Sequence, residues 1–311
     1  MSDTVLVRAR GLTKVFGSFT AVDGIDVEVH AGESFGFLGP NGAGKSSTMR
    51  MIGCVSPVTS GELSVFGLDP ATHGRAIRAR LGVCPQQDVL DGELTVEENL
   101  WVYGRYFGLS RREAKSRTAE LLDFAQLTER RADKVEPLSG GMKRRLTIAR
   151  SLISDPELLL LDEPTTGLDP QARHVLWDRL FRLKRQGVTL IVTTHYMDEA
   201  EQLCDRLVVM DGGRIAAQGS PRDLIAAHCT REVLELRFDV DDASAAGVAE
   251  RLAGVGTRID GLPDRLLVYA DDGEGALAQV HARGVRPVSS LVRRSSLEDV
   301  FLQLTGRSLV D

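Results

Sequence analysis

The chain has 311 residues, enough for one large domain and one small one, and 42% of them are hydrophobic and 26% charged, as in an ordinary soluble globular protein. Its net charge of −6 argues against a broad nucleic-acid-binding surface. No apolar run approaches the ~18 residues that span a bilayer, and residues 1–4 lack the pattern of a signal peptide. We therefore expect that any action on a membrane goes through another chain.

Cysteine usage is typical of a reducing, cytosolic environment. The four cysteines, at positions 54, 84, 204 and 229, form neither a CxxC pair nor a zinc-binding spacing. We expect partly buried free thiols.

The first 38 residues predict an antiparallel β subdomain followed by a buried strand. Short strands are expected at 5–9 and 12–16, with a turn after them. Residues 21–29 alternate between apolar and polar side chains, as an antiparallel strand with one solvated face does. The apolar run 35–38 predicts the buried strand.

A phosphate-binding motif follows this strand. We call it the phosphate loop; it fits G-x-x-x-x-G-K-[ST] and consists of Gly39, Pro40, Asn41, Gly42, Ala43, Gly44, Lys45, Ser46 and Ser47. Because a helix is predicted over 45–53, successive N–H groups and the helix N-terminus would point at one anion. Lys45 would reach the β- and γ-phosphates of a nucleotide, and the Ser46 hydroxyl would ligate Mg²⁺.

Between about residues 60 and 155 the pattern changes from strands to helices. A turn is expected at 60–62, with strands at 63–66 and 81–86. Capping boxes that begin at Thr95 and Ser110 predict two helix starts. We interpret about 87–155 as a helical insertion into a nucleotide-binding core, with helices over about 95–107, 110–125 and 140–154.

The last of these helices opens on a second anion-binding device. Ser139, Gly140, Gly141 and Met142 place a hydroxyl and unpaired N–H groups together at the helix start. The basic run 143–145 that follows is interpreted as a solvated helix face or as a segment beside the phosphate.

Two carboxylates end the apolar strand predicted at 158–161. A strand that is apolar on both faces is typical of the centre of a parallel sheet, and such sheets place ligands at their carboxyl edge. Asp162 can hold Mg²⁺ there, and Glu163 can orient an attacking water.

The remaining pattern predicts a parallel sheet covered by helices and then a separate small domain. Strands and helices alternate up to about residue 220, which completes an α/β core. From 232 the order is βαββαβ plus a terminal helix, the ferredoxin-like α+β arrangement, without a cluster of catalytic side chains. We predict domains at 4–228 and 229–311, the second regulatory or dimerising. Its elements are expected at 232–238, 242–253, 256–260, 265–270, 274–283 and 286–292, with the last helix from 296.

The phosphate loop, 138–142 and 158–163 together resemble the ATPase subunits of ABC transporters over about residues 5–220. The resemblance implies a P-loop NTPase fold that binds ATP and Mg²⁺. Phe16 matches the aromatic that stacks on adenine, and Gln86 matches the Q-loop glutamine that completes the Mg²⁺ site with Ser46 and Asp162. Asp169 matches the D-loop at a dimer interface, and His195 matches the switch histidine on the γ-phosphate.

Family geometry also implies that the phosphate loop of one subunit faces the signature, residues 139–142, of a second. Each motif occurs once in this chain, so a homodimer or a heterodimer with a similar ATPase domain is needed, and nucleic acid is not an expected partner. Met142 departs from the family, where glutamine is common. Because Ser139 and Gly141 keep the phosphate contacts, we expect function to persist.

Four finer stretches resemble exporters of the nodulation-factor and daunorubicin-resistance type, namely 95–108, 139–170, 193–206 and 295–307. This implies an ATPase at the cytoplasmic face of the membrane that drives export through a separate permease. Drugs and antibiotics, as in multidrug efflux and antibiotic resistance, and lipid-like or oligosaccharide cargo stay open. A permease-free ABC ATPase and an import ATPase are the alternatives. The aromatic residues Trp101, Tyr103, Tyr106 and Phe107 either meet the permease or pack inside the insertion.

Overall fold

The computed structural model describes residues 4–238 and 245–306. Its contacts divide the chain into two compact units, Met1–Ser220 and Pro221–Asp311, and we treat each unit by itself. The helix α8 (Pro221–His228), which lies ahead of the domain boundary predicted at 228/229, groups with the second unit. None of the helices in these described ranges is long and apolar enough to cross a membrane, and the four cysteines are free thiols.

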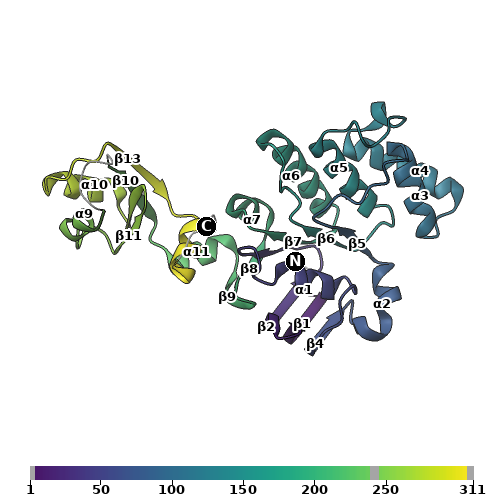
Figure 1. Ribbon diagram of the computed structural model, residues 1–311, viewed down its shortest axis with the longest axis horizontal. Coiled ribbons are helices and arrows are strands. Elements are labelled where there is room, and N and C mark those ends of the chain that lie inside the picture. Colours follow the sequence, from purple (N-terminus) through teal and green to yellow (C-terminus); the bar gives the residue numbers. More distant parts are fainter. Residues whose placement is uncertain (1–3, 239–244, 307–311) are drawn as a thin grey trace. The chain divides into compact units, whose positions relative to one another are not determined.

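A six-stranded sheet forms the centre of the first unit (Figure 1). The strand order is β5-β6-β7-β3-β8-β9, and every neighbouring pair is parallel except β8 with the edge strand β9. The predicted parallel sheet is thus confirmed. Its strands are β3 (Ser34–Leu38), β5 (Leu81–Cys84), β6 (Leu158–Asp162), β7 (Thr189–Thr194), β8 (Arg206–Asp211) and β9 (Arg214–Gly219).

The register of this sheet brings three chain segments to one edge. Leu38 at the end of β3 pairs with Thr194 of β7, and Asp162 at the end of β6 pairs with Thr193. Because the strands are parallel, the segments after β3, β6 and β7 all leave from the same carboxyl edge.

A second, antiparallel sheet has the order β2-β1-β4, with β1 (Val5–Phe16), β2 (Phe19–His30) and β4 (Ser60–Val65). Two expectations were wrong in detail. The strands predicted at 5–9 and 12–16 are one strand, because a register irregularity around Gly11, whose φ is 55°, lets the strand continue. The turn predicted at 60–62 is part of β4, because these residues pair with β1.

Helices surround the six-stranded sheet, and those between β5 and β6 form the predicted helical insertion (Figure 1). Observed capping boxes at Thr95 and Ser110 begin α3 and α4. The helix α2 was missed because Pro70 begins it and Gly74 lies within it, and both residues disfavour helix in sequence-based reasoning. The helices are α1 (Lys45–Ile52), α2 (Pro70–Arg78), α3 (Val96–Tyr106), α4 (Arg111–Ala125), the short 3₁₀ turn Thr128–Arg130, α5 (Gly140–Ser151), α6 (Pro170–Arg185) and α7 (Met197–Leu203).

The second unit contains a four-stranded antiparallel sheet of order β11-β12-β10-β13, the ferredoxin-like order that the βαββαβ pattern predicts. The strand predicted at 286–292 begins later, because Pro287 cannot donate to a ladder. The strand predicted at 256–260 also begins later, at Arg258, and residues 242–244 of a predicted helix lie outside the described ranges. The elements are β10 (Glu232–Arg237), α9 (Ala245–Arg251), β11 (Arg258–Leu262), β12 (Arg265–Ala270), α10 (Gly273–Ala282), β13 (Ser289–Arg294) and α11 (Leu297–Thr305).

Helices cover both faces of this sheet. On one face, buried residues such as Leu234 and Val268 pack with Val248 of α9 and Val280 of α10. On the other face Tyr269 lies in a smaller cluster with Leu302 of α11. The helix α11 also packs against α8, so the first and last helices of the unit hold each other.

Candidate active site

The phosphate loop connects β3 to α1 at the carboxyl edge of the sheet. Two of its glycines are required by space. Gly44 has φ of 101° and caps α1, and a Cβ there would collide with the carbonyl oxygen of Ala21 on β2. A Cβ on Gly39 would collide with the carbonyl oxygen of Met210 on β8. The phosphate loop is therefore held between the two sheets, with its backbone packed closely against both.

Lys45 is buried inside this loop, with 4% of its surface exposed. Its Nζ donates to the carbonyl oxygens of Gly39 at 2.7 Å and Pro40 at 3.0 Å, and lies 3.8 Å from Oε1 of Glu163. Burial lowers the pKa of Lys45, while the nearby Glu163 and Asp162 oppose that shift. The ammonium group is held by neutral carbonyls and one loosely placed carboxylate, an arrangement that suits an incoming anion.

Asp162 is the last residue of β6 and accepts hydrogen bonds from two hydroxyl groups. Its Oδ1 accepts from Ser46 Oγ at 3.0 Å and from Thr193 Oγ1 at 2.5 Å. Thr193 was not among the predicted site residues, although its place at the end of a buried strand was a usable signal. A hydroxyl, a carboxylate and the nearby Gln86 amide are the oxygen donors that Mg²⁺ prefers, so these residues fit that ion.

Glu163 is the point where the predicted site residues converge. Its carboxylate is 6% exposed, and its Oε2 accepts from Gln86 Nε2 at 3.0 Å and from Thr166 Oγ1 at 3.2 Å. Its Oε1 lies 3.4 Å from His195 Nδ1, which makes no hydrogen bond of good geometry. Three segments distant in the sequence therefore place polar atoms around one carboxylate.

The backbone of Glu163 is unusual too. Its φ is 47°, in the left-handed region that non-glycine residues rarely adopt. Its N–H donates to the carbonyl oxygen of Thr193 at 3.1 Å, which fixes the residue to β7. Strain of this kind costs on the order of 1 kcal/mol and is common at functional sites.

Other predicted residues lie apart from this cluster. Ser139 is exposed and caps α5 by accepting from the Met142 N–H at 3.3 Å, and Asp169 is exposed and caps α6. In residues 4–238 and 245–306, no hydrogen bond or ion pair joins residues 139–142 to the phosphate loop. Phe16 is half-exposed at the end of β1, with Lys14 Nζ 4.8 Å from its ring centre.

The basic run after the signature is not a uniform solvated face. Arg144 is 4% exposed and its guanidinium donates to backbone carbonyls around Asp162 and Gln86. Sequence reasoning missed this because the partners are carbonyls that lie far away along the chain. Arg145 also points inward, toward the end of α4, where it donates to the Ala125 carbonyl at 2.9 Å.

The residues of the predicted aromatic patch differ in their exposure. Tyr103 packs on Phe107 at 5.4 Å between ring centres and under Arg150 of α5 at 4.7 Å, inside the helical insertion. Tyr106 is 80% exposed.

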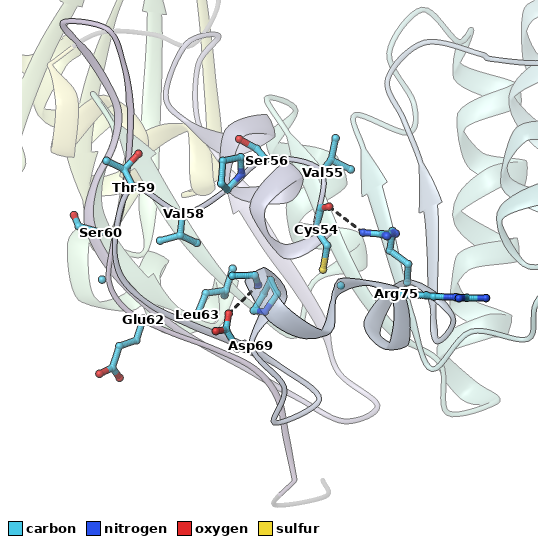
Figure 2. A pocket seen from close by; sticks show the side chains of 16 residues that line it. Cys54, Val55, Ser56, Val58, Thr59, Ser60, Glu62, Leu63, Asp69 and Arg75 are labelled. Carbon is cyan, nitrogen blue, oxygen red and sulfur yellow. Dashed lines mark hydrogen bonds between the residues drawn. The ribbon is translucent and has the colours of Figure 1, made fainter.

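Two hollows lie near this site. A groove of about 360 Å³ beside Gln86 is bordered by the exposed side chains of Val55, Val83 and Val89. A larger hollow of about 830 Å³, shown in Figure 2, lies among the segment after α1, β4 and α2. In that view Glu62 points away from the hollow, and Asp69 is engaged in capping α2. The larger hollow contains none of the predicted site residues.

Two family models and several known proteins match this chain. A family model described as "ABC transporter" matches residues 22–166, and one described as "Nodulation factor export protein NodI, C-terminal domain" matches residues 244–306. The chain is 44% identical to the "Nod factor export ATP-binding protein I" of Ralstonia nicotianae, over 100% of this chain and 97% of that protein. It is 47% identical to the protein of the same name from Rhizobium meliloti, over 99% of this chain and 90% of that one.

Solved structures show the same fold. A dimeric ATP-binding cassette bound to ADP and Pi in a post-hydrolysis state has a TM-score of 0.63 and 29% identity, covering 69% of this chain and 98% of that one. The cbiO1 subunit of an ABC transporter complex from Clostridium perfringens has a TM-score of 0.67 and 27% identity, covering 72% of this chain and 92% of that one. The predicted P-loop fold is thereby confirmed.

Proposed function

The chain belongs to the family of Nod factor export ATP-binding proteins of ABC transporters, and we propose that it hydrolyses ATP to drive export of a lipid-like oligosaccharide through a separate permease. The observation that carries the proposal is the convergence of Lys45, Gln86 and His195 on the Glu163 carboxylate beside the phosphate loop. The relatives are named for Nod factor export, so the drug and antibiotic alternatives are not taken further.

Nucleotide binding falls to the phosphate loop and its neighbours. Its backbone N–H groups and the α1 N-terminus would hold the phosphates, with Lys45 as the buried counter-charge. Ser46, Gln86 and Asp162 would hold Mg²⁺, which when bound neutralises charge on the phosphate oxygens. The half-exposed ring of Phe16 offers a face for the adenine.

Glu163 is the residue that acts on water. Its carboxylate accepts a hydrogen bond from the attacking water and takes its proton as the oxygen–phosphorus bond forms and ADP leaves. Because the carboxylate is buried, it acts in a medium where electrostatic interactions are stronger than in water. His195 and Gln86, both close to this carboxylate, orient the γ-phosphate and the water relative to it.

The second half of the site comes from another copy of the ATPase. Support comes from the exposed cap residue Ser139 and the exposed Asp169, each free of bonds to the phosphate loop in the described ranges. A related cassette is described as dimeric. We propose a homodimer in which ATP binds between the phosphate loop of one protomer and residues 139–142 of its partner.

The permease docks beside Gln86 at the cytoplasmic face of the membrane. The groove bordered by Val55, Val83 and Val89 presents exposed apolar side chains next to a residue of the site. Tyr106 on α3 is also exposed. Pro221–Asp311 forms a regulatory or dimerising unit, and its match to an export family favours the exporter over an importer or a permease-free ATPase.

Reconstitution tests this function. The protein is purified from membranes together with its permease, which is then identified, and the pair is placed in inside-out vesicles. We expect ATP-dependent uptake of a lipid-linked oligosaccharide, and none with Glu163→Gln. Uptake of a cationic drug alone, or purification without any membrane protein, would overturn the proposal.

A further inference from the structure

Arg144 occupies a position that the proposed reaction does not yet use. It lies on α5, two residues beyond the signature residues 139–142 that open this helix, and only 4% of it is exposed. We propose that Arg144 is a positioning residue, which transmits the position of the signature helix to the catalytic Glu163 and to Gln86. This inference rests on the proposed function.

All five guanidinium N–H groups of Arg144 find a backbone carbonyl as acceptor. The acceptors belong to two segments, the one that carries Gln86 and the one that carries Asp162 and Glu163. Nε donates to Pro164 O at 2.8 Å, Nη1 to Pro85 O at 2.6 Å and Gln86 O at 3.2 Å, and Nη2 to Asp162 O at 2.9 Å and Glu163 O at 3.1 Å.

Three of the five bonded carbonyls belong to Gln86, Asp162 and Glu163, whose side chains form the proposed site. Arg144 holds the backbone of Gln86 and of Glu163, and the side chains of these two residues bond to each other at 3.0 Å. The acidic side chain bonded to Arg144 is Asp88, at 3.5 Å and part-exposed. The cation therefore acts chiefly as a rigid fork between two peptide segments.

A shift of α5 would consequently move both segments. The N-terminus of α5 is the part that meets the partner's nucleotide in the proposed dimer, so closure of that interface changes the place of Arg144. Because Arg144 makes five hydrogen bonds to the segments of Gln86 and Glu163, its movement repositions these two residues in the protomer's own site. Arg144 thus links the arrival of one ATP to the readiness of the other site.

The neighbouring basic residues do not share this role. Lys143 is half-buried at the start of the same helix, and its side chain has no hydrogen bond among the described residues. Arg145 donates to Ala125 O and to Gln126 Oε1 at the end of α4, away from Glu163. A lysine at 144 would keep the charge but has only three donors on a tetrahedral ammonium, so it cannot bond to all five carbonyls.

The test compares Arg144→Lys and Arg144→Gln with the control Lys143→Gln in the full chain. We expect both Arg144 variants to lose at least about tenfold in kcat for ATP, with KM changed less than about threefold. Binding of a fluorescent ATP analogue to the monomer should match wild type, which also measures the folded fraction. Lys143→Gln should stay within about twofold of the wild-type kcat.

Two outcomes overturn the inference. One is a wild-type kcat in Arg144→Lys. The other is a fall in kcat that only follows a fall in analogue binding, because that would show loss of folded protein alone. If the wild-type protein with its permease binds ATP without hydrolysing it, the proposed function itself fails, and the inference fails with it.

Discussion

Each unit of the chain buries a carboxylate among basic and polar side chains, and the two differ in how tightly those partners hold it. Asp299 in the second unit is 1% exposed and receives Arg293 Nη1 at 2.7 Å and Nη2 at 2.9 Å. It also accepts from the Ser296 N–H at 2.8 Å, from Ser296 Oγ at 3.2 Å and from Tyr269 OH at 3.2 Å. Around Glu163 the nearest charged nitrogen, Lys45 Nζ, is 3.8 Å away, and His195 Nδ1 is 3.4 Å away.

Burial of a charged group therefore does not by itself mark a reactive site. Burial works against the charged form of Asp299, but the hydrogen bonds from Arg293 and Ser296 outweigh it and hold its pKa below the usual range. The Asp299 carboxylate, held by these partners, fixes α11 on the sheet. Lys45 and His195 are close to Glu163 without being committed to it, so they remain available to a substrate.

The largest effect is expected from removing the charge of Glu163. Glu163→Gln keeps the shape of the side chain but removes the proton acceptor, so ATP turnover should fall by about 10²–10⁴-fold. ATP binding should persist and the dimer should accumulate, as size-exclusion chromatography with and without ATP would show. Turnover at the wild-type rate would remove Glu163 from its assigned role.

The next largest effect concerns the signature. Ser139→Arg places a bulky cation at an exposed helix start and should lower turnover of the homodimer by roughly 10²-fold, because it obstructs the partner's site. Monomer affinity for an ATP analogue should stay unchanged in equilibrium titration. A loss of monomer affinity would place Ser139 in the site of its own subunit.

In the second unit the same kind of change should alter stability and leave chemistry intact. Asp299→Ala removes the buried carboxylate of the pair and leaves the part-buried Arg293 with one carboxylate partner fewer, which should cost about 3–5 kcal/mol of unfolding free energy in that unit. Thermal unfolding and limited proteolysis would measure it. The control is Asp264→Asn, which removes the pairs of an exposed carboxylate with Arg237 at 3.3 Å and Arg265 at 3.8 Å and should cost under about 1 kcal/mol. Equal losses of unfolding free energy in Asp299→Ala and Asp264→Asn would contradict the expected difference between the buried and the exposed carboxylate.

The pH dependence has a defined sign. Because the pKa of Asp299 is lower in the folded chain than in the unfolded one, its contribution is present above about pH 4 and is lost as pH falls further. The second unit should lose stability on acidification from pH 5 to pH 3, and Asp299→Asn should flatten that loss. An unchanged slope in the variant would show that other carboxylates control the acid limb.

The smallest effect is expected at Met142. Ser139 Oγ accepts from the backbone N–H of Met142, a bond that does not depend on the side chain. Met142→Gln should therefore change kcat by less than about threefold in a steady-state ATPase assay. A tenfold gain would show that the thioether limits the signature.

Local chemistry made much of this molecule predictable. The spacing of Gly39, Gly44 and Lys45 specified the phosphate loop, and the capping boxes at Thr95 and Ser110 marked α3 and α4 within a residue or so. What sequence reasoning missed depends on contacts across the chain. Arg144 looked solvated because its backbone acceptors carry no side-chain signal.

The central feature of the proposed mechanism is that each ATP site is shared between two subunits. Mixing Lys45→Ala protein with Ser139→Arg protein tests this directly by steady-state ATPase assay. In a mixed dimer one phosphate loop and one signature remain intact and face each other. Random pairing makes about half of the dimers mixed, so activity should rise above that of either variant alone, to at most about a quarter of the wild-type rate. Coupling between the two sites through Arg144 would keep the rate below that ceiling. A mixture no more active than either variant alone would contradict the shared site.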